Sequence, residues 1–255
     1  MRGLTGKTAI VTGGGSGIGK AISTRLAEEG CKVAIFDINA AAASEVAQAL
    51  NGAGGQALAV EADVGDYGAV QRAVAQVESA LGPVEILVNN AGWDRIVNFL
   101  DTDLPFWDKV ISINLHGPLN MHHVVLPGMV ERGGGKVINI ASDAGRVGSS
   151  GEAVYSACKG GLISFTKTMA REMARARINL NVVCPGPTET PLFSAIAGEG
   201  EVGAKIADGL RKAIPFRRLG TPEDLPGAVA FLASTDADFI TGQVLSVSGG
   251  LTMAG

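Results

Sequence analysis

The chain has 255 residues, of which 46% are hydrophobic and 18% are charged, and its formal net charge is −4. This composition excludes a disordered chain, and the net negative charge argues against a nucleic-acid surface. A chain of this length can bury a full core, and α/β folds of this size often form one domain. No stretch approaches the ~18 apolar residues of a membrane span, and the N-terminus lacks the apolar core of a signal peptide. We therefore expect a soluble, cytoplasmic protein.

A glycine-rich turn lies between the first predicted strand and the first predicted helix. Residues 8–11 form an apolar run typical of a buried strand, residues 12–19 form the turn, and apolar residues then recur at helical spacing from Ile18. At such a junction the free N–H groups and the dipole of the helix favour a phosphate, and glycine lets the backbone approach it. A merely flexible turn is the alternative, but the position between strand and helix favours nucleotide binding.

Asp37 ends the second predicted strand, residues 32–36, and lies eighteen residues after Gly19. A carboxylate there can accept hydrogen bonds from a ribose 2′-hydroxyl and repels a 2′-phosphate. Neither Ser16 nor Ile38 supplies a cation for such a phosphate. The pattern therefore favours NAD over NADP, and the alternative is a solvated aspartate at a strand end.

Strands and helices continue to alternate along the chain. Further strands are predicted at 57–60, 86–88, 136–140, 178–183 and 239–245, and helices at 40–51, 103–130 and 153–176. Asp66 and Thr221 are expected to cap two more helices. This alternation predicts a single-domain α/β Rossmann fold over 1–255, with a doubly wound seven-stranded parallel sheet and helices on both faces. Residues from about 188 to 215 are expected to form a substrate lid.

The predicted helix 103–130 contains a proline and two histidines. Pro118 removes a backbone hydrogen bond and should kink the helix. His122 and His123 have no evident third ligand nearby, so we interpret them as surface or interface residues and expect no metal site.

The three cysteines, Cys31, Cys158 and Cys184, form no C-x-x-C pair, which indicates reduced thiols. Cys158 is expected to pack inward as a small apolar residue rather than to act as a nucleophile.

Tyr155 and Lys159 lie four residues apart in the predicted helix 153–176 and therefore on one face of it. The ammonium favours phenolate, so it should lower the pKa of Tyr155 and suit the phenol to proton transfer at an alcohol or carbonyl oxygen. Ser142 follows the strand 136–140, at the sheet edge where open α/β sheets bind ligands. Taken alone, a Tyr-x-x-x-Lys pair is more often a solvated helix face.

Together these motifs resemble those of the short-chain dehydrogenase/reductase family. The turn 12–19, the run 89–92, Ser142 and the Tyr155–Lys159 pair occur in the family's order and spacing over nearly the whole chain. The resemblance implies an NAD-dependent oxidoreductase that interconverts a secondary alcohol and a ketone by hydride transfer. It also implies a homotetramer or homodimer, with the tail 248–255 at a subunit contact.

The resemblance further implies roles for individual residues. Tyr155 would transfer the proton, Ser142 would hold the substrate oxygen, and Lys159 would lower the pKa of Tyr155 and bind the nicotinamide ribose. Asn114 would hold a water that connects Lys159 to solvent. The residues implied to bind the cofactor are Gly13, Ser16, Gly17, Ile18, Gly19, Asp37, Asp63, Val64, Asn90, Ala91, Gly92, Tyr155, Lys159, Pro185, Gly186, Thr188 and Thr190.

Within the family, residues 89–94, 121–123, 142–152 and 184–187 are similar to the 2-hydroxycyclohexanecarboxyl-CoA dehydrogenases of aromatic and alicyclic acid degradation. This resemblance implies a 2-ketocyclohexane thioester as product and Ser142, Trp93, Arg146 and Tyr155 as substrate contacts. The cations implied to meet CoA phosphates are Arg146, Arg211, Lys212, Arg217 and Arg218. The alternatives are a core tryptophan and ordinary surface charge.

Three other functions stay open. A 3-oxoacyl-(acyl-carrier-protein) reductase would share the catalytic residues, but Asp37 disfavours the NADP that such enzymes commonly use. A dehydrogenase of free cyclic or secondary alcohols would need no thioester contacts. A non-catalytic NAD-binding regulator would not need the Ser142, Tyr155 and Lys159 that this chain retains.

Overall fold

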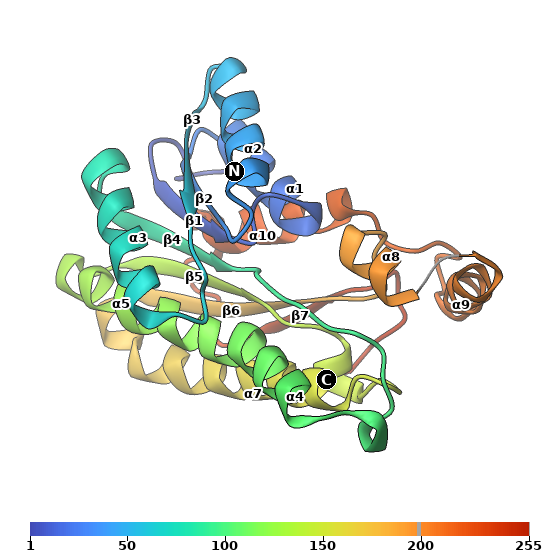
Figure 1. Cartoon of the computed structure of the whole chain (residues 1–255). Coiled ribbons are helices and arrows are strands. Elements are labelled where there is room, and N and C mark those ends of the chain that lie inside the picture. The colour runs from blue at the N-terminus through green and yellow to red at the C-terminus, as the bar shows by residue number, and fades with distance from the viewer. Residues whose placement is uncertain (198–199, 255) are drawn as a thin grey trace.

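Seven parallel strands form one sheet in the computed structural model, which describes residues 1–197 and 200–254 (Figure 1). The strand order is β3-β2-β1-β4-β5-β6-β7, so the chain reverses its direction of travel across the sheet between β1 and β4. The strands are β1 Thr8–Thr12, β2 Lys32–Asp37, β3 Gln56–Glu61, β4 Val84–Asn89, β5 Gly135–Ile140, β6 Ile178–Pro185 and β7 Val244–Val247. The predicted doubly wound, seven-stranded parallel sheet is confirmed.

Helices cover both faces of the sheet, as Figure 1 shows. On one face lie α1 (Gly17–Glu28), α2 (Ala40–Gly52) and α10 (Pro226–Ala233). On the other face lie α3 (Tyr67–Leu81), α5 (Gly117–Arg132) and α7 (Ala153–Glu172). The chain is completed by α4 Leu104–Ile111, α6 Ala144–Val147, α8 Pro191–Ala197, α9 Gly200–Ala213 and the 3₁₀ turns Phe99–Asp101, Ala174–Ala176, Pro222–Asp224 and Thr235–Ala237.

The core follows from the two-residue period of a strand. In β1, Ala9 and Val11 pack into the cluster beneath α1 and α10, whereas Ile10 packs into the cluster beneath α3 and α5. All three are fully buried. Both faces of the sheet are therefore apolar, which is why the strands read as continuous hydrophobic runs rather than as alternating ones. Burial of each large aliphatic side chain contributes about 1.5–3 kcal/mol.

Two predicted elements differ from the structure. The last strand begins at Val244 rather than at 239, and Phe239 is fully exposed in the turn that precedes it. The predicted helix 103–130 is divided by a π-helical turn, Ser112–His116, after which α5 begins at Gly117. Pro118 offers no N–H to the carbonyl of Asn114, so the irregularity falls where the ladder is interrupted.

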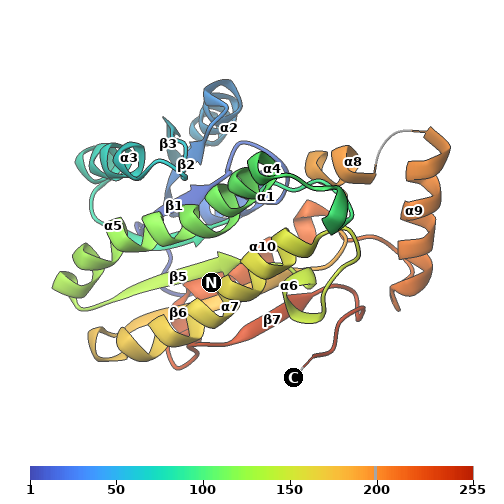
Figure 2. The same ribbon diagram turned by 60° about the horizontal axis from the view of Figure 1, so that its bottom comes forward.

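The remaining helix boundaries lie close to their predictions. Asp66 caps α3 by accepting from the N–H of Ala69, and Thr221 forms a capping box with Asp224. The predicted lid contains α8 and α9, which lie together at one end of the molecule in Figures 1 and 2. Residues 198–199, within that predicted lid, lie outside the described residues. Over the part of the chain that the structure describes, no helix has both the length and the apolar character to cross a membrane.

Candidate active site

A cavity of about 1030 Å³ opens where several strands reach their carboxyl ends. Parallel strands present these ends at one edge of the sheet, and the point at which strand order reverses leaves a crevice there. Every residue that the sequence implied for cofactor binding lines this cavity. These positions come from the carboxyl ends of β1, β2, β3, β4 and β6 and from α7, and the fold brings them together.

The glycine turn after β1 forms one wall of the cavity. Gly13 and Gly17 have φ values of +61° and +49°, a backbone conformation that favours glycine. A Cβ on Gly19 would lie 2.0 Å from the carbonyl oxygen of Gly13, so the turn packs on α1 without space for a side chain. Ser16 caps α1 without a side-chain hydrogen bond. The turn therefore offers backbone N–H groups and a helix N-terminus to an anion.

Asn90, after β4, fixes this turn from the neighbouring strand. Its Nδ2 donates to the carbonyl oxygens of Thr12 at 2.9 Å and Gly13 at 3.2 Å. The hydroxyl of Thr12 in turn accepts from the backbone N–H of Asn90 and Ala91, both at 3.0 Å. Asn90 thus stabilises the glycine turn, and its cofactor role stays a prediction.

Asp37 closes the adenosine end of the cavity. Its Oδ2 accepts from the N–H of Gly15 and its Oδ1 from the N–H of Asn39, both at 2.9 Å. The neighbouring Ile38 is 70% exposed and carries no charge. Among the described residues no lysine or arginine forms an ion pair with Asp37. This end therefore fits a ribose with a free 2′-hydroxyl, and a 2′-phosphate would face an uncompensated carboxylate.

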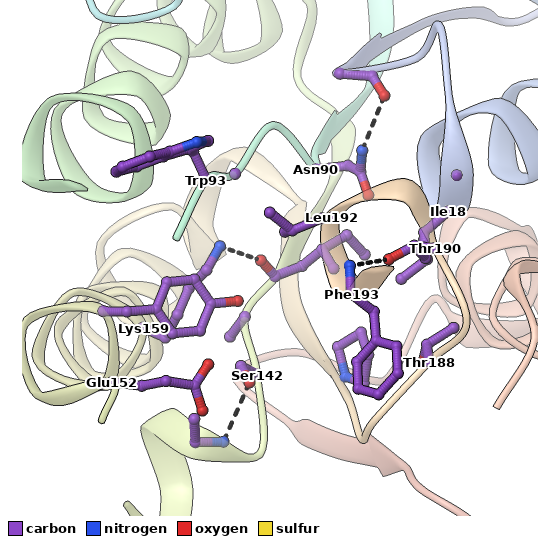
Figure 3. Close-up of a pocket in the computed structure, with 18 of the residues that line it drawn as sticks. Ile18, Asn90, Trp93, Ser142, Glu152, Lys159, Thr188, Thr190, Leu192 and Phe193 are labelled. Atoms are coloured by element: carbon purple, nitrogen blue, oxygen red, sulfur yellow. Dashed lines mark hydrogen bonds between the residues drawn. The ribbon is translucent and has the colours of Figure 1, made fainter. Parts of the chain in front are cut away.

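Ser142, Tyr155 and Lys159 line the opposite wall, and Figure 3 shows Ser142 and Lys159 at the cavity. Ser142 follows β5, and its Oγ accepts from the N–H of Ala144 at 3.1 Å. Lys159 is 2% exposed, and its Nζ donates to the carbonyl oxygen of Ile140 at 3.0 Å. The same Nζ lies 5.5 Å from the ring centroid of Tyr155. The three predicted catalytic groups are thus adjacent, although they come from two elements.

The predicted influence of Lys159 on Tyr155 is wrong for this structure. Burial raises the pKa of Tyr155 above its ordinary value, the charge of Glu152 raises it further, and only the hydrogen bond with Ser142 opposes the rise. Burial also lowers the pKa of Lys159 to about 8. Desolvation is the largest cause of the rise, and the Nζ of Lys159 donates to the carbonyl oxygen of Ile140.

Asn114 lies beneath the cavity rather than in its lining. It is fully buried in the π-helical turn, and its Nδ2 donates to the carbonyl oxygens of Trp93 at 2.7 Å and Val110 at 2.9 Å. Its Oδ1 accepts from the N–H of Trp93 at 3.3 Å. One amide hydrogen and Oδ1 therefore hold Trp93, the other amide hydrogen bonds back to Val110 in α4, and the water-holding role stays a prediction.

The two implied substrate residues outside the catalytic group lie in different places. Trp93 lines the cavity, its ring packs edge-on against Phe106 with centroids 5.8 Å apart, and Lys109 Nζ lies 3.8 Å from its centroid. Arg146 does not line the cavity. It donates instead to Ser246 Oγ at 2.8 Å and to the carbonyl oxygen of Ala254.

The other cations implied for CoA phosphates already have partners. Arg211 pairs with Glu189 at 3.6 Å, Lys212 with Asp208 at 2.7 Å, and Arg218 with Asp224. Arg217 donates to the carbonyl oxygen of Lys212. Besides the predicted Lys159, the described cavity lining contains the cation Lys109, which was not among the predicted residues.

Apolar side chains line the rest of the cavity, its apolar end, and four of them come from the segment 188–215 expected as a lid, whereas Ile96 and Val147 were not predicted. The residues there are Ile96, Val147, Leu192, Phe193, Ile206 and Leu210. They come from the loop after β4, the short α6, and α8 and α9, where the sequence shows no motif. Thr190, at the base of this end, accepts from the N–H of Phe193 through its Oγ1 at 3.0 Å.

His122 is not a surface residue, contrary to the prediction. It is 1% exposed, its Nδ1 bonds to the carbonyl oxygen of Pro118 at 2.6 Å, and its Nε2 accepts from Asn139 at 3.3 Å. Burial lowers the pKa of His122 to about 4. His123 is exposed and bonds to the hydroxyl of Tyr67 at 2.7 Å. The sequence could not separate the neighbours because the π-helical turn rotates α5 relative to a regular helix.

The cysteines agree with the prediction, since Cys31, Cys158 and Cys184 are free thiols and all are buried. Among the described residues, no three histidine, cysteine or carboxylate side chains lie close enough to hold a metal ion.

Comparison with known proteins gives consistent matches along the chain. A family model described as enoyl-(acyl carrier protein) reductase matches residues 13–252. The human (3R)-3-hydroxyacyl-CoA dehydrogenase is 39% identical, covering 98% of this chain and 97% of its own. Acetoacetyl-CoA reductase of Allochromatium vinosum is 39% identical, covering 97% of this chain and 99% of its own. The crystal structure of 3-ketoacyl-(acyl-carrier-protein) reductase from Brucella melitensis, complexed with NADH, superposes with a TM-score of 0.90 at 36% identity over 98% of this chain and 100% of its own.

Proposed function

This chain belongs to the short-chain dehydrogenase/reductase family, and from that premise we propose that it is an NAD-dependent dehydrogenase of β-hydroxyacyl thioesters. The chain is an oxidoreductase that acts on CH–OH groups. Its specific substrate is proposed to be 2-hydroxycyclohexanecarboxyl-CoA, which is oxidised to the 2-keto thioester. The observation that carries the proposal is the single cavity that joins Asp37, the Ser142–Tyr155–Lys159 group and an apolar end.

The relatives support the position of the hydroxyl group. The names 3-hydroxyacyl-CoA dehydrogenase, acetoacetyl-CoA reductase and 3-ketoacyl-(acyl-carrier-protein) reductase all place the reacting oxygen on the carbon β to a thioester carbonyl. In 2-hydroxycyclohexanecarboxyl-CoA the hydroxyl is on the ring carbon beside the one that bears the thioester, which is the same β position. One binding geometry at Ser142 and Tyr155 therefore serves linear and cyclic substrates.

Bound NAD supplies hydride acceptance at the nicotinamide ring. Ser142 and Tyr155 hold the substrate oxygen, and Tyr155 takes its proton during oxidation or returns one to the ketone during reduction. Lys159, buried against the carbonyl of Ile140, places a positive charge below Tyr155. Asn114 holds Trp93, and Trp93 with Leu192 and Phe193 excludes water from the ring of the substrate.

The anionic part of the thioester is its coenzyme A arm, which carries the phosphates. Of the cations considered, Lys109 lines the cavity and lies over the Trp93 ring, whereas the residues of 211–218 pair with other groups. Because Lys109 lies over Trp93, it lies beside the acyl end, whereas the phosphates of coenzyme A are a full pantetheine arm away from the acyl group, so we assign them no partner inside the cavity.

Steady-state assays with purified protein test this function. We expect oxidation of 2-hydroxycyclohexanecarboxyl-CoA with NAD to exceed that with NADP, and Tyr155→Phe to lose about 10²–10⁴-fold in kcat. NADH binding by fluorescence should persist in Tyr155→Phe, as the control for folding. Equal kcat/KM for free cyclohexanol and the thioester would overturn the thioester assignment.

A second candidate, a 3-ketoacyl-(acyl-carrier-protein) reductase, is favoured by the superposition with that enzyme from Brucella melitensis. Acetoacetyl groups carried on acyl-carrier protein and on coenzyme A distinguish the two functions. A clear preference for the carrier protein would favour the second.

A further inference from the structure

Two carboxyl side chains lie beside Tyr155, and the proposed mechanism uses neither of them. Asp94 follows Trp93 in the segment after β4 and is 4% exposed. Glu152 precedes α7 by one residue and lies one helical turn before Tyr155. Glu152 makes no capping hydrogen bond and lines the cavity. Figure 3 shows its carboxylate turned toward the cavity on the same side as Ser142.

The two carboxyl groups line one small cavity behind the active site, and neither forms an ion pair among the residues that the structure describes. In the described part of the chain, neither oxygen of Asp94 has a hydrogen-bond partner of good geometry. No lysine or arginine nitrogen there lies within 4.0 Å of Asp94 or Glu152. Burial raises the pKa of Asp94 to about 7, and Glu152 raises it further through its charge and a shared hydrogen bond, against the influence of Arg95 and Lys159. The neutral form of Asp94 is thereby favoured, and Glu152 is the member of the pair that lines the active-site cavity.

The Glu152 carboxyl group faces the position that the acyl group of the substrate must occupy (Figure 3). Ser142 and Tyr155 fix the reacting oxygen, so the carbon chain beside it lies near Glu152. A free carboxylate two carbons away from that oxygen would enter a largely dehydrated site beside a like charge. A thioester or ester at the same position is neutral and meets no such repulsion.

We propose that the Asp94–Glu152 pair is the specificity determinant that excludes free hydroxy acids and reserves the cavity for esterified ones. The proposal rests on the proposed function, because it concerns the acyl end of the same substrate. The pair discriminates by repelling the excluded ligand rather than by attracting the preferred one. Neither residue takes part in the proton or hydride transfer.

The test compares a neutral and a charged form of one small substrate. Ethyl 2-hydroxycyclohexanecarboxylate and the free acid have the same ring and hydroxyl. Neither carries coenzyme A, so contacts of the coenzyme A arm do not affect the comparison. We expect the wild-type protein to oxidise the ester in preference to the acid. Glu152→Gln should lower this ratio of kcat/KM values by about 10- to 100-fold. Glu152→Lys should lower it further or invert it, and Glu131→Gln, an exposed acid on α5, should leave it unchanged.

Inhibition keeps the test decisive if a variant turns over slowly. The inhibition constants of the two ketone products, as ester and as free acid, are measured in the presence of NADH, and the same change in their ratio is expected. A ratio within about twofold of wild type in both Glu152 variants, by turnover and by inhibition, overturns the proposal. Failure of the wild-type protein to oxidise both the ester and the CoA thioester would instead contradict the proposed function.

Discussion

Tyr155 holds its proton more tightly in this cavity than a tyrosine does in water, because burial disfavours the phenolate. Alcohol oxidation needs the phenolate, whose fraction rises about tenfold per pH unit below the pKa and levels off above it. The raised pKa therefore predicts that kcat/KM for oxidation increases with pH from 7 to 9 without a plateau. A pH profile measured with saturating NAD checks this, and a rate independent of pH above 7 would contradict it. Ketone reduction needs the protonated phenol and should lack this increase.

His122 is the residue that couples folding to acid pH. The folded protein disfavours the imidazolium, and its pKa is lowered from 6.5 to about 4, so the unfolded chain binds more protons between these values. The stability from neutral His122 is fully present above pH 6.5 and is lost as the pH falls toward 4. Its size is at most about 3 kcal/mol.

Denaturant unfolding at pH 7 and pH 4.5 checks this prediction. The free energy of unfolding should fall more between the two pH values in the wild type than in His122→Gln. The neighbouring exposed His123→Gln should behave as the wild type does. The same fall in both variants would show that other groups cause the acid sensitivity.

At the scale of elements, the contact of α1 with the glycine turn has no free space. A Cβ at Gly19 would lie 2.0 Å from the carbonyl oxygen and 2.8 Å from the carbonyl carbon of Gly13, and both of these Gly13 atoms belong to the backbone. Gly19→Ala should therefore displace the turn and weaken NADH binding by at least ~10-fold, since the N–H groups that face the pyrophosphate move with it. Gly227 in α10 has no atom within 4 Å of its Cβ position.

The control follows from that difference. Gly227→Ala should keep NADH affinity and raise the free energy of unfolding by about 0.5–1 kcal/mol through helix propensity. Fluorescence titration and denaturant unfolding of both variants check the pair. Unchanged NADH affinity in Gly19→Ala would contradict the predicted role of the turn.

Elements with a strong local pattern could be predicted from the sequence, and those fixed by tertiary contacts could not. The strands β1 to β6 are short apolar runs bounded by polar or glycine residues, so their predicted positions agree with the structure. The segment 239–243 has strand-like residues, but the pairing of β7 with β6 begins only at Val244, so this segment stays outside the sheet. The π-helical turn at Ser112–His116 could not be predicted either, because it is defined by backbone hydrogen bonds and the 3.6-residue spacing of apolar side chains does not show it.

For the site, motifs located the cofactor wall and the catalytic group, because the carboxyl ends of parallel strands must meet at one edge. The segment of α8 and α9 was expected near the substrate as a lid, but which of its side chains line the cavity could not be predicted, since that depends on the fold. Arg146 shows the same limit, because its partner Ser246 is 100 residues away in the chain.

At the scale of the whole molecule, β7 is an edge strand with exposed apolar residues near it. Leu245 is 44% exposed, and Phe216 and Met253, close to the C-terminal turn, are 72% and 83% exposed. Unpaired strand edges and apolar patches favour association. We therefore predict a dimer or tetramer that uses this edge.

Sedimentation of Leu245→Lys checks the association. The variant should dissociate to a smaller species at concentrations where the wild type stays associated. Gln56→Lys, on the opposite edge strand β3, is the matched control and should leave the mass unchanged. A wild-type monomer would contradict the prediction outright.

The hydrogen bond between Thr190 and the N–H of Phe193 has a kinetic consequence. Thr190 is among the residues implied to bind the cofactor, whereas Phe193, one turn later, is an apolar residue of the cavity lining. Binding of the cofactor would therefore fix the start of α8, which carries Phe193. We expect compulsory-order kinetics, with the dinucleotide first on and last off. NADH should then inhibit competitively against NAD, the keto thioester should inhibit noncompetitively against NAD, and random-order product inhibition would contradict this coupling.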